Sequence, residues 1–244
     1  MHDHHTDLPR TLHYDPAWIR ANSLGENAIA MVESLAQRMT LLPGMRVLDL
    51  GCVNAITSIF LAREFGVTVW AVDSKVDPTK NAHRINAMHL SARVFPIRAL
   101  ATELPFAEEY FDAIVAVDSY LYYGTDDTYL DYIAKFLRAG GELGIVDACF
   151  REELLSINDA PEHLRPHFVD LWSKLHSIPW WKAHLGKSNA VSVNVAEEVP
   201  AARAIFSEYI KSNARHSLEA DLITAIKQDH GEMIRLFRLV ARKA

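Results

Sequence analysis

The sequence predicts an α/β protein built on a doubly wound, mostly parallel β-sheet. Two observations carry this prediction. Short apolar runs alternate with stretches of helical periodicity, at short spacing, over residues 45–146. The first of these runs, residues 45–50, is almost continuously apolar, which is typical of a strand buried on both faces. Strands joined by helices in this way form a parallel sheet with a helical layer on each face.

The first elements have clear boundaries. Apolar residues recur at helical spacing over residues 26–40, and the Pro43-Gly44 pair then breaks the chain before the first strand. A second helix is expected over residues 55–65. It ends at Gly66, because glycine readily adopts the left-handed conformation that closes a helix.

The later elements continue the alternation and then depart from it. Further strands are expected at residues 67–72, 92–97, 112–117, 141–146, 190–195 and 232–241. Further helices are expected at residues 78–88, 127–137 and most of 201–229. We expect a single domain over residues 1–244, in which residues 1–25 and 150–190 form a helical and aromatic cap over the sheet.

Composition excludes several classes of protein. The 31 acidic and 25 basic residues give a net charge of −6, which argues against a protein that mainly holds nucleic acid. No apolar run has the length of a membrane span. Two cysteines, Cys52 and Cys149, cannot form a disulfide framework. We therefore expect a cytoplasmic protein with a small-molecule substrate. Whether it forms a homo-oligomer or has a different partner chain stays open.

Acidic residues gather at the strand ends. In a doubly wound sheet, ligands bind beyond the carboxyl ends of the strands, where the strand order reverses. Four of the first five strands end in a carboxylate: Asp49, Asp73, Asp118 and Asp147. Asp73 ends the second strand, 24 residues after Asp49, and a carboxylate at that place can accept two hydrogen bonds from a ribose diol.

Four segments together carry a resemblance to a known family. They are residues 47–52 (VLDLGC), 72–73 (VD), 104–112 (LPFAEEYFD) and 137–141 (LRAGG). Their combination resembles the class I S-adenosylmethionine-dependent methyltransferases, and is similar in particular to the small-molecule enzymes of the ubiquinone/menaquinone-methylase type. The resemblance covers roughly residues 40–148. It implies a seven-stranded sheet of order 3-2-1-4-5-7-6, with the last strand antiparallel.

The resemblance also implies roles for single residues. It places Asp49, Gly51 and Cys52 in the loop beneath the methionine part of S-adenosylmethionine. Asp73 would hold the ribose hydroxyls, with Ser74 beside the adenine. The residues implied near the adenine edge are Ala101 and Thr102.

The loop after the first strand departs from the family's pattern. The family reads Asp-x-Gly-x-Gly-x-Gly, whereas this chain reads DLGCVNA over residues 49–55, so only Gly51 survives. Val53 and Ala55 replace the second and third glycines. Valine is β-branched and resists positive φ, and its side chain adds bulk where the methionine part would lie. Either the loop has shifted and still binds the cofactor, or the fold has lost the cofactor and serves other chemistry.

Candidate catalytic groups follow from the same strand ends and from the cap. Methyl transfer requires in-line positioning and sometimes a base. Asp118, Asp147, His176 and His184 are the candidate bases, and Tyr120 is a candidate for shaping the pocket. No metal site is expected.

Three functions remain open at this point. The first is methyl transfer from S-adenosylmethionine to a small polar or amine-containing molecule. The second is a cofactor-free substitution, elimination or cyclisation of a natural-product intermediate. The third is a non-catalytic subunit that supports a catalytic partner. The altered glycine loop is the feature that favours the second and third.

Overall fold

A single seven-stranded sheet organises the molecule. The computed structural model describes residues 8–168, 172–211 and 217–244. The strand order is β3-β2-β1-β4-β5-β7-β6, which confirms the predicted order. The strands are β1 (Arg46–Leu50), β2 (Thr68–Asp73), β3 (Val94–Arg98), β4 (Phe111–Val117), β5 (Leu137–Phe150), β6 (Val191–Glu198) and β7 (Ile234–Lys243).

The first five strands run parallel and the last pairings are antiparallel. β1 pairs in parallel with both β2 and β4, so the strand order reverses between β1 and β4. β7 inserts between β5 and β6 and is antiparallel to both. This arrangement places the carboxyl ends of the first five strands at one edge of the sheet, where α/β folds bind ligands.

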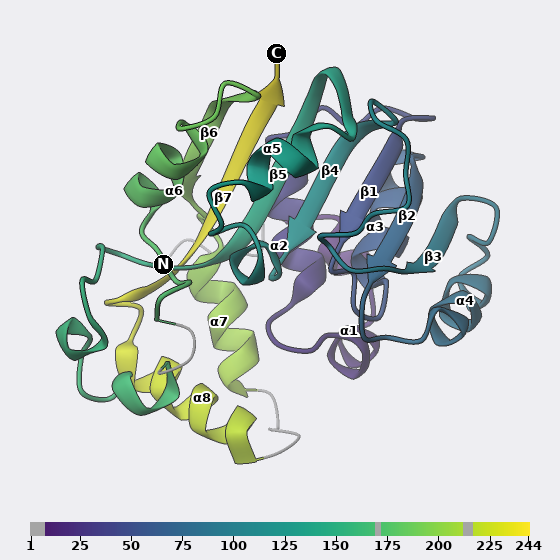
Figure 1. Ribbon diagram of the computed structural model, residues 1–244. Helices are drawn as coiled ribbons and strands as arrows, with labels where there is room; N and C mark the ends of the chain where they lie inside the picture. Colours follow the sequence, from purple (N-terminus) through teal and green to yellow (C-terminus); the bar gives the residue numbers. More distant parts are fainter. Residues whose placement is uncertain (1–7, 169–171, 212–216) are drawn as a thin grey trace.

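Eight helices surround the sheet in the part of the chain that the structure describes (Figure 1). They are α1 (Pro16–Asn22), α2 (Ala28–Ala36), α3 (Ile56–Phe65), α4 (Pro78–Ala87), α5 (Tyr129–Ala134), α6 (Ile178–Leu185), α7 (Ala202–Lys211) and α8 (Ser217–Asp229). None of these helices is long and apolar enough to span a bilayer.

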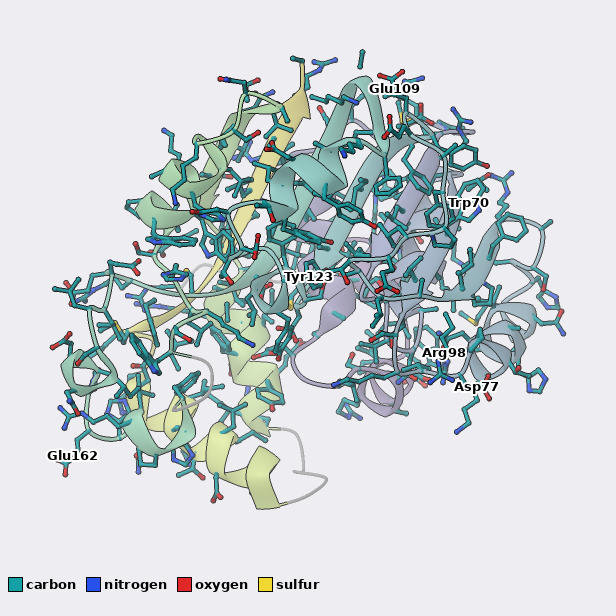
Figure 2. The ribbon with its side chains drawn as sticks, viewed as in Figure 1. Trp70, Asp77, Arg98, Glu109, Tyr123 and Glu162 are labelled. Carbon is teal, nitrogen blue, oxygen red and sulfur yellow. The ribbon has the colours of Figure 1, made fainter. Side chains whose placement is uncertain are left out.

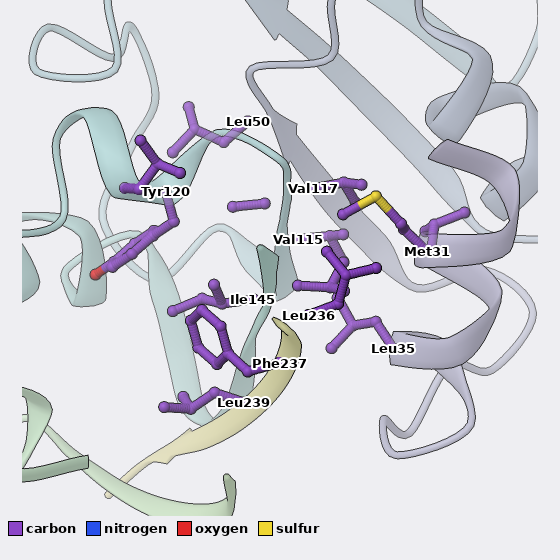
Figure 3. Close-up of a cluster of buried hydrophobic side chains, with 14 of the residues drawn as sticks. Met31, Leu35, Leu50, Val115, Val117, Tyr120, Ile145, Leu236, Phe237 and Leu239 are labelled. Atoms are coloured by element: carbon purple, nitrogen blue, oxygen red, sulfur yellow. The ribbon is translucent and has the colours of Figure 1, made fainter. Parts of the chain in front are cut away.

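The core lies on both faces of the central strands. Figure 3 shows Met31 and Leu35 of α2 on one side of the sheet, and Tyr120 and Phe237 on the other. All four side chains are buried. Burial on both faces explains why β4 reads as a continuous apolar run instead of an alternating one.

One element boundary differs from the prediction. The helix expected at residues 127–137 ends at Ala134, and β5 already begins at Leu137. Leu137 pairs with Phe111 at the start of β4, and the register shifts by the next pair. Pairing with the neighbouring strand therefore overrides the local helical pattern at the end of that segment.

One part of the expected cap lies elsewhere. Three residues of the same cap segments do line a cavity at the sheet edge: Leu24, Phe168 and Leu175. Residues 178–185, expected over the sheet edge, form α6, which packs against β6. Trp181 of α6 is fully buried, and its ring lies 5.9 Å from the ring of Phe237. Beyond the carboxyl ends of the parallel strands lie α7 and α8 instead (Figure 1).

Candidate functional site

A cavity of about 670 Å³ opens at the carboxyl ends of the parallel strands. Figure 2 shows at which end of β4 the cavity lies. Glu109 lies near the amino end of β4, and Tyr123, which lines the cavity, lies just past the carboxyl end of that strand. One part of the cavity runs along the loops after β1, β2 and β3. The other part extends under α7 and α8 and has mostly apolar walls.

The loop after β1 has positive φ at all three positions where the family has glycine, although only Gly51 is a glycine here. Gly51, Val53 and Ala55 all have positive φ, at 78°, 47° and 57°. A β carbon on Gly51 would lie 2.6 Å from the β carbon of Ser119, so this position cannot carry a side chain. Valine and alanine in this region carry strain, of order 1–2 kcal/mol per residue. Val53 and Ala55 therefore hold torsions that glycine adopts more readily.

Hydrogen bonds from two sides hold Val53 in this conformation. Its N–H donates to Oδ2 of Asp73 across 3.0 Å, and its carbonyl accepts from Nδ2 of Asn81 across 2.8 Å. Asn81 is buried, and its Oδ1 accepts from Arg84 across 2.7 Å. Arg84 also donates to the carbonyl of Asn54 across 3.1 Å. Asn81 and Arg84 thus form a polar clamp behind the strained loop.

Asp73 lies at the end of β2, as predicted, and lines the cavity. Its Oδ1 accepts from the N–H groups of Lys75 and Val76, both at 2.8 Å. Together with the Val53 bond, three backbone donors fix the carboxylate. Because each carboxylate oxygen has two lone-pair sites, Oδ1 is filled and one site on Oδ2 stays open to a hydroxyl donor from the cavity.

Three further residues that the resemblance assigned to the cofactor also line the cavity. Ser74 follows Asp73, and Ala101 and Thr102 lie in the loop after β3. Together with Gly51 and Asp73 they face one continuous space.

Asp49 and Cys52 lie outside that space. Asp49 is buried and accepts hydrogen bonds from Thr57 and Ser58 at 2.6 Å and 2.5 Å. Burial raises its pKa to about 6. Its carboxylate ties β1 to the first turn of α3. Cys52 is also buried, which raises its thiol pKa well above the usual range.

Three carboxyl groups gather at the junction of the two parts of the cavity. Asp118 follows β4, has a positive φ of 50°, and its accessible surface faces the cavity. Within the described part of the chain its carboxylate has no hydrogen-bond partner. Burial, and then the charges of Glu26 and Asp147, raise its pKa well above the usual range. Glu26 lines the cavity beside it, and burial raises its pKa too.

Asp147 lies directly beneath the wall. It is fully buried and accepts from the N–H groups of Leu121 and Ala148 at 3.2 Å and 3.0 Å. Burial raises its pKa to about 7 despite these two bonds. Leu121 and Ala148 line the cavity, so Asp147 hydrogen-bonds to residues of the cavity wall without itself lining the cavity.

Three predicted catalytic residues are placed away from the cavity. Tyr120 is fully buried, and its ring packs against Tyr129 and Trp181. His176 stacks on Trp180 at 3.5 Å, and its Nδ1 lies 2.6 Å from Oε1 of Glu153. Neither of these side chains lines the cavity, and His184 does not line it either. No group of described residues could hold a metal ion.

The apolar part of the cavity comes mainly from residues that the sequence did not single out. They are Leu24, Leu121, Phe168, Leu175, Tyr209, Leu222, Ile226 and Ile234. Three of them, Tyr209, Leu222 and Ile226, lie in α7 and α8. The only sequence signal of these three was the apolar face of an ordinary amphipathic helix.

Comparison with known proteins agrees with this geometry. Residues 47–141 match a family model described as a methyltransferase domain. A curated relative, the methyltransferase GfsG of Streptomyces halstedii, is 33% identical over 141 residues, which cover 57% of this chain and 50% of the relative. The chain thus spans about half the length of that relative.

Solved structures share the fold at low identity. Phosphoethanolamine N-methyltransferase 2 of Haemonchus contortus, in complex with S-adenosyl-L-methionine, has a TM-score of 0.76 at 18% identity, covering 100% of this chain and 60% of that one. The [4+2]-cyclase SpnF has a TM-score of 0.74 at 19% identity, covering 98% and 92%. At these identities the likeness concerns the fold alone.

Proposed function

Since this chain belongs to the class I S-adenosylmethionine-dependent methyltransferase superfamily, we propose that it transfers a methyl group from S-adenosylmethionine to a small molecule in the apolar part of the cavity. One observation carries the proposal. The loop after β1 keeps positive φ at Val53 and Ala55, at an energetic cost, and presents the Val53 N–H to Asp73. Strain that the surrounding structure maintains is typical of a working site.

The residues present suit the cofactor. Asp73 offers the open site on its Oδ2 to a ribose hydroxyl. Gly51 keeps the floor of the site open, since a β carbon there would collide with Ser119. Ala101 and Thr102 supply a small wall suited to the adenine. When bound, S-adenosylmethionine supplies an activated methyl group on a positively charged sulfur.

Asp118 is the proposed base. A hydroxyl or amine loses a proton when it is methylated, and the Asp118 carboxylate is free to accept it. Its raised pKa makes it a stronger proton acceptor than an ordinary aspartate. Asp147 and Glu26 sustain that pKa through their charge, so they tune the base without contacting the acceptor.

One observation favours a second candidate function. The Val53 side chain faces the cavity, in the part assigned to the cofactor. If it blocks the cofactor, the same carboxyl groups could serve a cofactor-free reaction. SpnF, named as a [4+2]-cyclase, shows the same fold.

The test is turnover. The purified chain is incubated with methyl-labelled S-adenosylmethionine and a panel of apolar alcohols, phenols and amines, and S-adenosylhomocysteine formation is followed by mass spectrometry. The proposal predicts acceptor-dependent formation that Asp118→Asn lowers by at least tenfold. A panel in which acceptors disappear at the same rate without S-adenosylmethionine would support the second candidate instead.

A further inference from the structure

We propose that the acceptor is an apolar molecule without negative charge, and that its reacting group is an O–H or N–H donor. This inference rests on the proposed function and deepens it. It is carried by the walls of the apolar part of the cavity, hereafter the acceptor chamber: Leu24, Leu121, Tyr122, Phe168, Leu175, Tyr209, Leu222, Ile226 and Ile234.

The chamber walls are apolar along three separate segments. Leu121 comes from the turn after β4, Phe168 and Leu175 from the segment before α6, and Leu222 and Ile226 from α8. Leu222 and Ile226 are one helical turn apart, so they present one face to the chamber. Walls of this kind stabilise a ligand mainly by burying its apolar surface.

The charged groups at the chamber are almost all acidic. Glu26 and Asp118 line the cavity, and Asp147 lies just beneath its wall. Lys75 is the one lysine or arginine among the described lining residues, and it follows β2 beside Asp73. Lys174 lies at the edge of the chamber, with its Nζ 5.4 Å from the centre of the Tyr122 ring.

Asp118 and Glu26 are the carboxyl groups that line the cavity at the chamber, whereas the Tyr122 and Tyr209 hydroxyls can donate or accept. A carboxylate without a partner, such as that of Asp118, accepts hydrogen bonds and attracts donors. An acceptor with a carboxylate or phosphate near its reacting end would place like charges together at Asp118 and Glu26, without the arginine pair that anion sites use. Alcohols, phenols and amines satisfy Asp118, whereas anions do not.

Three probes with the same apolar body test the inference. They are 2-naphthylmethanol, 2-naphthylmethylamine and 2-naphthoate, whose binding to the full chain is measured by fluorescence titration with and without saturating S-adenosylhomocysteine. We expect the alcohol or the amine to bind at least tenfold more tightly than the carboxylate. Tighter binding of either the alcohol or the amine than of the carboxylate supports the inference.

A matched pair of variants locates the effect. Leu222→Lys places a cation at the chamber wall, and should improve naphthoate binding at least fivefold. Thr224→Lys places the same charge on the exposed side of the same helix, and should leave the dissociation constant for naphthoate within twofold of the native value. Circular dichroism and thermal melts confirm that both variants fold.

Several results would overturn the inference. In the first, naphthoate binds as tightly as the other two probes. In the second, no probe binds measurably. In the third, Leu222→Lys and Thr224→Lys change naphthoate binding equally. Titration with S-adenosylhomocysteine alone reports separately on the proposed function. If that ligand does not bind, the proposed function fails, while the charge preference of the chamber is still read from the titrations without it.

Discussion

The backbone N–H of Val53 and Oδ2 of Asp73 are joined by a hydrogen bond of 3.0 Å. The bond links the two positions on which cofactor binding depends: the place of the family's second glycine and the carboxylate for the ribose. Val53 makes this bond while its φ is 47°. Val53 therefore holds a strained, glycine-like torsion that hydrogen bonds to Asp73 and Asn81 stabilise.

Val53→Gly should tighten S-adenosylmethionine binding by about threefold to tenfold. The substitution removes a side chain from the cavity wall and the strain of a β-branched residue at positive φ. Relief of about 1–2 kcal/mol is offset by the roughly 0.5–1 kcal/mol that glycine adds to the entropy of the unfolded chain. Calorimetric titration measures the affinity and urea unfolding the stability. Weaker binding would show that the valine side chain contacts the ligand favourably.

Ala55→Gly is the matched control for that variant. Ala55 also has positive φ, but its side chain is fully buried and does not line the cavity. Its substitution should change the free energy of unfolding by about 1 kcal/mol or less and leave the affinity within twofold. An equal gain in affinity from both variants would attribute the effect to loop strain alone.

Asn81→Ala should weaken S-adenosylmethionine binding about tenfold, because the Val53 carbonyl loses its donor and Arg84 loses an acceptor. The same substitution in the Val53→Gly background should cost less than threefold, since glycine needs no support at positive φ. A double-mutant cycle on the dissociation constants gives the coupling. A purely structural Asn81 would lower affinity equally in both backgrounds.

Asp147→Asn should flatten the pH dependence of stability. Asp147 has a pKa of about 7 in the folded protein, against an ordinary 3.8. Between these values the folded state holds more protons than the unfolded chain, so stability is highest at the acidic end and falls as pH rises, by up to about 1.4 kcal/mol per pH unit. The raised pKa values of Glu26 and Asp118 likewise lower the free energy of unfolding as pH rises.

Urea unfolding of both proteins at pH 5, 6, 7 and 8 measures that slope. The free energy of unfolding of Asp147→Asn should overtake that of the native chain as pH rises towards 8. Parallel pH profiles for the two proteins would contradict the assigned pKa.

The sheet and the cofactor side of the site could be predicted from sequence, because both depend on local pattern. Apolar runs ended by carboxylates marked the strands, and Asp73 lies at its predicted place. The acceptor chamber could not be predicted. Leu222 and Ile226 look like any apolar helix face, and periodicity does not tell whether that face covers a core or a cavity.

Aromatic richness was a misleading guide for the same reason. Trp181 and Tyr120 come from segments that resemble a pocket lining, yet both are fully buried and pack against each other with ring centres 5.8 Å apart. Large aromatic rings contribute most when wholly buried, so they mark the core as readily as a site.

Calorimetric titration of the chain with S-adenosylmethionine and S-adenosylhomocysteine tests the central claim most directly. We expect binding in the micromolar range, about −8 kcal/mol, and its loss in a folded Asp73→Ala variant. No heat and no thermal shift with either ligand, for both the native chain and Val53→Gly, would contradict it.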